Sequence, residues 1–236
     1  MTAPTVTAHR STVRLPAALS FIAGVTDVTS WLLLGGLFTA HITGNLVVLA
    51  ADAVTRTPPH LAAVLALPAF VVITVLATRV ARRFGEHRAR TRRALLGAQA
   101  VLLVAAAVLS FAGEASSAPN GSLAPAIGLC AVCAMASQNA YLHLVPAKAY
   151  TTAVMTGNLV AATIAGADLL ASRGASPEAR ARWSGSWPLL AGFVGGCLVG
   201  AAASTLFGDH AAVVPAVLAA ALFCATAFRR GEPAID

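Results

Sequence analysis

The chain of 236 residues is too apolar for a soluble domain, because 58% of its residues are hydrophobic and only 11% are charged, against about 25% charged in soluble proteins. Apolar runs of about 20 residues recur, the length that a helix needs to cross a bilayer, so we expect an all-α polytopic membrane protein. An outer-membrane barrel is excluded, since it would show short segments of alternating hydrophobicity. The net charge of +7 does not indicate nucleic acid, because basic residues of membrane proteins gather at the cytoplasmic face.

Eight apolar elements follow one another along the chain, four in each half. They are expected at about 16–34, 37–54, 61–81, 94–112, 123–145, 149–171, 188–207 and 211–228. The first is a retained span, because it is too long for a signal peptide and contains Asp27. The expected organisation is therefore a tail (1–15), a first membrane repeat (16–112), a second membrane repeat (123–228) and a second tail (229–236).

The pentapeptide Thr-Gly-Asn-Leu-Val occurs twice, at 43–47 and at 156–160, about half the chain length apart. The residues upstream, 38–42 and 151–155, also echo each other. Paired polar interruptions in corresponding halves of an apolar chain indicate duplication and point to a site at the repeat interface. The alternative is a helix-packing or capping motif that is used twice.

The distribution of Lys and Arg decides how many elements cross. If all eight crossed, Arg10 and Arg14 would lie opposite the seven arginines of 79–93. If the two Thr-Gly-Asn elements enter and leave by the same face, six spans remain, 15 basic residues fall on one side and only Arg56 on the other. We therefore expect about six transmembrane helices plus two re-entrant or broken helices, arranged as an inverted repeat with cytoplasmic termini in a bacterial inner membrane. Element 149–171 is long enough to cross, so that alternative stays open.

The Thr-Gly-Asn motif suits the start of a half-helix, because Thr and Asn are N-cap residues and Gly permits the turn. Two such N-termini near the midplane would offer N–H groups to an anion or a polar solute. Asp27 lies mid-span, where a charge is costly, so we expect it to be buried beside a Thr-Gly-Asn element and functional or paired. A protonated or hydrogen-bonded structural Asp is the alternative. The candidate substrate-binding residues are Asp27, His41, Thr43, Gly44, Asn45, Gln138, Asn139, Thr152, Thr156, Gly157 and Asn158.

Motifs for chemistry are missing from the sequence. It has no phosphate-binding loop and no zinc-protease motif, and Cys130 and Cys133 have no His or acidic residue beside them. We expect no enzyme, no cofactor and no metal. The expected partners are the lipid bilayer and a small-molecule solute, without nucleic acid, and a homo-oligomer is left open. Glycines four residues apart at Gly192, Gly196 and Gly200 predict close helix packing.

Residues 21–27 and 34–45, with Ala-Gly-Val-Thr-Asp and Thr-Ala-His-Ile-Thr-Gly-Asn, resemble the YoaK family of bacterial integral membrane proteins, a domain of unknown function. The second half is similar through 138–140 and 151–157. The resemblance covers about residues 16–228 and implies about six spans but no established substrate. Two functions stay open: a secondary transporter or channel for a small polar or anionic solute, and a non-transporting membrane scaffold or partner subunit whose polar motifs serve helix packing. A membrane-embedded enzyme is a third, less favoured reading.

Overall fold

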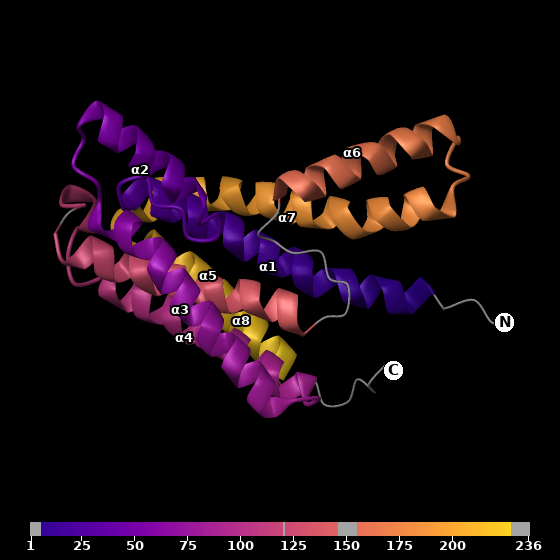
Figure 1. The fold of residues 1–236 in the computed structure, drawn as a ribbon, viewed down its shortest axis with the longest axis horizontal. Helices are drawn as coiled ribbons and strands as arrows, with labels where there is room; N and C mark the ends of the chain where they lie inside the picture. Colours follow the sequence, from indigo (N-terminus) through magenta and orange to yellow (C-terminus); the bar gives the residue numbers. More distant parts are fainter. Residues whose placement is uncertain (1–5, 120, 146–154, 228–236) are drawn as a thin grey trace.

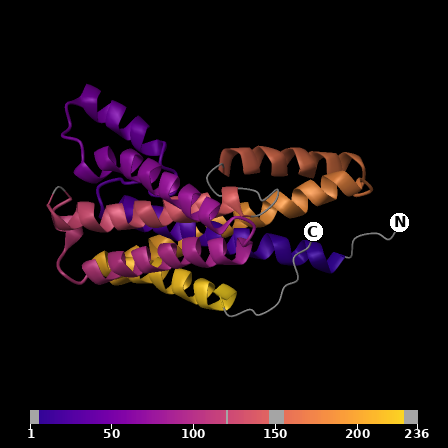
Figure 2. The same ribbon diagram turned by 60° about the horizontal axis from the view of Figure 1, so that its bottom comes forward.

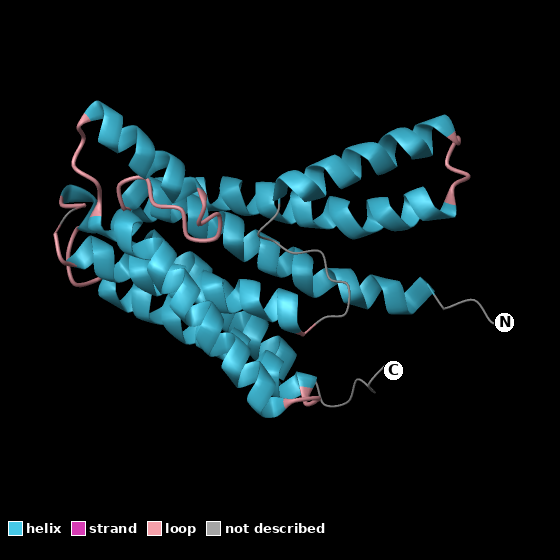
Figure 3. Cartoon of the chain, viewed as in Figure 1, coloured by secondary structure: helices cyan, strands magenta, loops and turns pink. Residues whose placement is uncertain are grey.

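The computed structural model describes residues 6–119, 121–145 and 155–227 (Figure 1). All the regular secondary structure within these ranges is helical (Figure 3). The helices are α1 (Val6–Leu33), α2 (Gly44–Thr55), α3 (Leu61–Phe84), α4 (Arg88–Leu109), η1 (Ala115–Ser117), α5 (Leu123–Leu144), α6 (Met155–Ala171), α7 (Pro177–Phe207), η2 (Gly208–Ala212) and α8 (Val213–Ala227). The expected all-α class is confirmed.

Five described stretches are long and apolar enough to cross a membrane. They are Leu15–Leu33, Leu61–Phe84, Arg88–Leu109, Leu123–Leu144 and Pro177–Ala227. The last has 51 residues and contains both α7 and α8, which run in opposite directions (Figure 1). The Thr-Gly-Asn helices are shorter, with 12 residues in α2 and 17 in α6. The membrane class is thus shown by several apolar helices of spanning length.

The connections between the helices gather at two ends of the long axis (Figures 1 and 2). The α3–α4 turn and the α6–α7 connection lie at the same end as the start of α1 and the end of α8. The α2–α3, α4–α5 and α7–α8 connections lie at the other end. The seven arginines of 79–93 therefore share one end with Arg173 and Arg180.

Helices α1 and α7 pack backbone to backbone. A Cβ atom added at Gly196 would lie 2.1 Å from the Phe21 carbonyl oxygen, and one at Gly24 would lie 2.3 Å from the Phe193 carbonyl oxygen. Gly192 and Gly200 approach the α1 backbone in the same way. Only glycine permits this separation, so the predicted close-packing face is confirmed.

The other long helices form a second group, in which α5 packs against both α3 and α4, and α4 also packs against α8. This group lies beside the α1–α7 pair (Figure 2). An amide pair joins the two groups: the side chain of Gln99 in α4 donates to Gln138 in α5 over 2.8 Å, and Gln138 donates to the Leu19 carbonyl in α1 over 3.1 Å. Both glutamines are buried, so each hydrogen bond is shielded from water.

Candidate solute site around Asp27 and His41

The segment between α1 and α2 turns back along α1. Gly35 and Gly36 have φ angles of +72° and +81°, a conformation that costs glycine little and other residues more. They bring Thr39 and Ala40 against the interior of the bundle, where both residues are 2% exposed or less. Irregular backbone is thereby buried beside a span, which is the condition under which such backbone is tolerated in a membrane.

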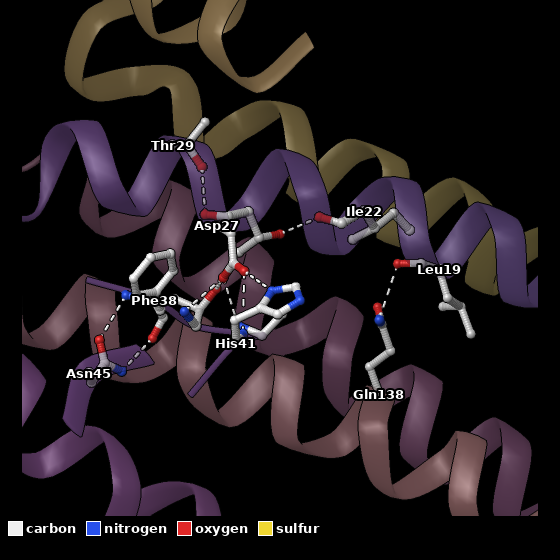
Figure 4. Close-up of polar contacts among 11 residues, drawn as sticks. Leu19, Ile22, Asp27, Thr29, Phe38, His41, Asn45 and Gln138 are labelled. Carbon is white, nitrogen blue, oxygen red and sulfur yellow. Dashed lines mark hydrogen bonds and ion pairs between the residues drawn. The ribbon is translucent and has the colours of Figure 1, made fainter. Parts of the chain in front are cut away.

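Asp27 holds this segment in place (Figure 4). Its Oδ1 accepts hydrogen bonds from the Thr39 N–H (2.8 Å), the Thr39 hydroxyl (2.8 Å) and the Ala40 N–H (2.7 Å). Its Oδ2 contacts His41 Nδ1 at 2.6 Å and accepts from the His41 N–H at 3.3 Å. The residue is 4% exposed. Both oxygens are therefore satisfied by this chain, and these charge-assisted bonds offset the burial of the carboxylate.

His41 extends from this cluster toward α7. Its ring meets the edge of Phe193 with 4.9 Å between the ring centroids, and its side chain is 27% exposed. Because Nδ1 faces the Asp27 carboxylate, we assign the Nδ1 hydrogen to that contact, which leaves Nε2 as the outward nitrogen. Nε2 has no hydrogen-bond partner in the part of the chain that the structure describes.

The first Thr-Gly-Asn motif begins α2, as predicted, but its capping differs from the expectation. Asn45 bridges the backbone of Phe38: its Oδ1 accepts from the Phe38 N–H (2.9 Å) and its Nδ2 donates to the Phe38 carbonyl (2.8 Å). Thr43 stands at the N-cap without a side-chain hydrogen bond to the helix. Thr43 therefore occupies the predicted N-cap position, but the N–H groups of residues 44–46 bond to the carbonyls of residues 41–43 and not to its hydroxyl.

Gly44 faces the same phenyl ring. A Cβ atom at Gly44 would lie 2.6 Å from a ring carbon of Phe38. The motif therefore binds the segment that precedes it in the chain. Gly44 leaves room for the Phe38 ring, and the Asn45 amide, which is 1% exposed, binds the Phe38 backbone. Neither group projects toward open space.

The second motif begins α6. Thr156 and Gly157 are exposed, whereas Asn158 is 6% exposed. An open hollow of about 470 Å³ lies between α6 and the first part of α7. It is lined by Thr156, Gly157, Val160, Ala161, Ile164 and Arg182. Thr152, the remaining predicted residue of this region, lies outside the described residues.

Gln138 and Asn139 are buried in α5. Gln138 contacts Leu19, about two helical turns before Asp27, so the structure assigns it to the neighbouring amide pair and not to the Asp27 cluster (Figure 4). The sequence reasoning missed Gln99, Thr39 and Phe193. Gln99 could have been found in the sequence, because it is an amide within an apolar span. Thr39 and Phe193 could not, because each is marked only by lying near a motif.

A small cavity lies between α1, α4, α5 and η2. Its volume of about 20 Å³ is enough for one water-sized molecule. Thr26, Thr29 and Ser30 line it from α1, and the hydroxyls of Thr26 and Thr29 donate to backbone carbonyls of their own helix. Asp209 lies at the rim and binds Ser116 through both carboxylate oxygens. Polar side chains of α1 therefore line this cavity, in addition to the Asp27 carboxylate that binds the segment before α2.

These features define a helical membrane protein in which a buried carboxylate contacts a partly exposed histidine beside an apolar helix of spanning length. A family model described as "Protein of unknown function (DUF1275)" matches residues 15–225. The chain therefore belongs to this family, which includes YoaK. No curated protein and no solved structure matches the chain.

Proposed function

We propose that the protein is a secondary transporter or channel that carries a small polar or anionic solute through a midplane site between its two halves. The observation that carries this proposal is the Asp27–His41 pair, which binds an irregular segment beside a span. Ionisable groups at membrane depth face the bundle interior and mark solute or proton pathways. If the segment were solely structural, it would need a buried carboxylate to accept its N–H groups. It would not need an imidazole nitrogen without a partner in the described part of the chain.

The two members of the pair have different roles in this proposal. Asp27 positions the loop, because its oxygens are occupied by Thr39, Ala40 and His41. His41 contacts the solute through Nε2. A neutral ring offers an acceptor at Nε2 to a polar solute, and a protonated ring offers a donor and a positive charge to an anion. Thr43, which is exposed at the start of α2 two residues after His41, is a second candidate for contact with the solute.

The inverted repeat forms part of the proposal, and two relationships support it. Helix α1 packs along α7, and α5 packs along α3, which are equivalent pairs if α5–α8 repeats α1–α4. Helices α2 and α6 also start near the middle of the long axis and run to opposite ends (Figure 1). Re-entrant half-helices from opposite faces have this arrangement. The exposed start of α6, at Thr156 and Gly157, would then form the second half of the path, with Asn158, Gln138 and Asn139 behind it.

We also propose a bacterial inner-membrane location with both termini in the cytoplasm. The end of the molecule that carries the 79–93 arginines also carries the start of α1 and the end of α8. Basic residues are retained on the cytoplasmic side during insertion.

The membrane scaffold is the second candidate, and a specific observation favours it. The polar side chains of Asp27 and Asn45 bind the chain's own backbone, as expected of groups that serve packing. The scaffold function requires these contacts for stability but has no need of His41 Nε2. The two functions therefore differ in what His41 does.

Flux through reconstituted liposomes tests the proposal. Purified protein is incorporated into vesicles, and uptake is measured for a panel of small carboxylates, inorganic anions and neutral polar solutes. We expect uptake of at least one class, lost in His41→Ala while the melting temperature falls by only a few degrees. Thr26→Val, which removes a buried hydroxyl that donates to the Ile22 carbonyl of its own helix, is the control. Unchanged flux in folded His41→Ala, or no flux by the wild type with any solute, would favour the scaffold.

A further inference from the structure

The outward face of α3 combines an apolar stripe with a basic end. Val72, Val75 and Leu76 are 56%, 46% and 47% exposed. Arg79, followed by 82–83, continues the same spacing of three and four residues and is also exposed. Residues at this spacing lie on one face of a helix. The face is therefore apolar for several turns and cationic where α3 ends.

The arginines near the α3–α4 turn differ in their contacts. Three of the four in α4 bind the ends of neighbouring helices: Arg88 donates to the Val145 carbonyl, Arg92 to Thr226 and Arg93 to Ala227. These carbonyls stand at the C-terminal ends of α5 and α8, which attract cations. The fourth, Arg90, is exposed and makes no such bond with the described residues.

The arginines of α3 make no such contact with the part of the chain that the structure describes. Among the described residues, no carboxylate lies within ion-pair distance of Arg79, Arg82 or Arg83, and Glu86 is the one acidic residue in the sequence from 79 to 93. Three guanidinium groups on one face are thus available to a partner outside the chain. Their planar donors match the oxygens of a phosphate group.

We propose that this face of α3 binds an anionic phospholipid, with acyl chains along Val72, Val75 and Leu76 and the headgroup phosphate on Arg79, Arg82 and Arg83. The apolar stripe distinguishes a lipid from free phosphate, because it continues the basic end along the span. The site is separate from the Asp27 cluster, so it does not depend on the transport proposal.

Lipid binding to the purified protein tests this site. Kd is measured by native mass spectrometry for phosphatidylglycerol and phosphatidylcholine, each added to protein in neutral detergent. We expect tighter binding of phosphatidylglycerol. The double variant Arg82→Gln/Arg83→Gln should weaken it roughly 25-fold, since each surface arginine contributes about fivefold in affinity. Arg82→Lys/Arg83→Lys should weaken it less than the glutamine variant, because the charge is kept and only the planar donors are lost.

The matched control is Arg173→Gln/Arg180→Gln, which removes two exposed arginines at the same end of the molecule. It should leave the Kd of phosphatidylglycerol nearly unchanged. Equal weakening by the two double variants would overturn the site, because it would reflect net charge alone. Equal Kd values for the two lipids would overturn it as well. A rise in melting temperature with inorganic phosphate that matches the rise with phosphatidylglycerol would assign the arginines to a free anion instead.

Discussion

Asp27 and His41 lie 14 residues apart and meet through Oδ2 and Nδ1 at 2.6 Å. Their contact closes the turn that the chain makes after α1. The carboxylate is nearly enclosed, whereas the imidazole is partly exposed. Asp27 is therefore enclosed by other residues of the chain, whereas His41 contacts Asp27 on one side and is partly exposed on the other. Substitutions at this pair can separate folding from activity.

Substitution of Asp27 should destabilise the protein to a degree that depends on the acceptors retained. Asp27→Asn keeps one oxygen for the N–H groups of Thr39 and Ala40, so it should cost about 1–3 kcal/mol. Asp27→Leu removes every acceptor and leaves several buried N–H groups unsatisfied, which should cost about 3–5 kcal/mol or more. Thermal unfolding of the purified protein in detergent shows whether the wild type, Asp27→Asn and Asp27→Leu follow this order of decreasing stability. A leucine variant as stable as the wild type would mean that the carboxylate does not hold the loop.

Asn45 should be a stability residue. Asn45→Ala leaves the half-buried N–H and carbonyl of Phe38 without their partner, so we expect a loss of about 1–3 kcal/mol. The neighbouring change Thr43→Ala should cost less than about 0.5 kcal/mol, because Thr43 is exposed and makes no side-chain cap. Both values come from the same unfolding experiment. If Asn45→Ala abolished flux without lowering stability, the amide would be a solute ligand.

The sequence predicted the long apolar helices, because length and apolarity can be read without a structure, whereas the number of helices that cross the membrane stays a prediction. It also placed Asp27 inside the bundle, which its 4% exposure confirms. Its partners, however, are residues 39–41, just upstream of the first Thr-Gly-Asn motif and not within it. The carboxylate's partners could not be predicted. A buried Asp can be satisfied by any nearby donor, and two of the donors here are the backbone N–H groups of Thr39 and Ala40, which carry no side-chain signal.

The element expected at 37–54 shows where sequence reasoning stops. The sequence predicts a re-entrant or broken helix with Thr-Gly-Asn at its start, and α2 does start at Gly44, but the mostly apolar residues before the motif give no sign of why they are not helical. The upstream segment stays irregular because Asp27 and Asn45 occupy the backbone groups of residues 38–41. Hydrogen bonds from distant residues therefore override local helical preference, and only a three-dimensional structure reveals them.

Close packing of α1 on α7 predicts a difference between two adjacent glycines. Gly196→Ala places a Cβ 2.1 Å from the Phe21 carbonyl oxygen, so the helices must separate, at a cost of about 1–3 kcal/mol or more. Gly195→Ala meets the Phe21 ring at 3.5 Å, an ordinary contact, and should be neutral or slightly stabilising. Comparing the melting temperatures of the two variants checks the interface. Equal values would show that α1 and α7 do not touch here.

The arrangement of the connections predicts which side of the membrane each one faces. Arg90, at the basic end, should be cytoplasmic, and Ser117, in η1 at the other end, should be outside. The α3–α4 turn carries the arginines of 79–93, and arginines beside membrane spans are retained on the cytoplasmic side. Arg90→Cys and Ser117→Cys are made in a background without the four native cysteines and treated with a membrane-impermeant maleimide.

In intact cells we expect labelling of Ser117→Cys but not of Arg90→Cys, and in inverted vesicles the reverse. Permeabilised cells are the control, because both cysteines should react there if both are exposed, as their parent residues are. Opposite labelling of the two positions would agree with an odd number of crossings between them. That is the result expected if α4 crosses, since it is the one long helix between residues 90 and 117. Strong labelling of Arg90→Cys from outside would contradict the cytoplasmic placement of the arginines, and with it the six-span arrangement.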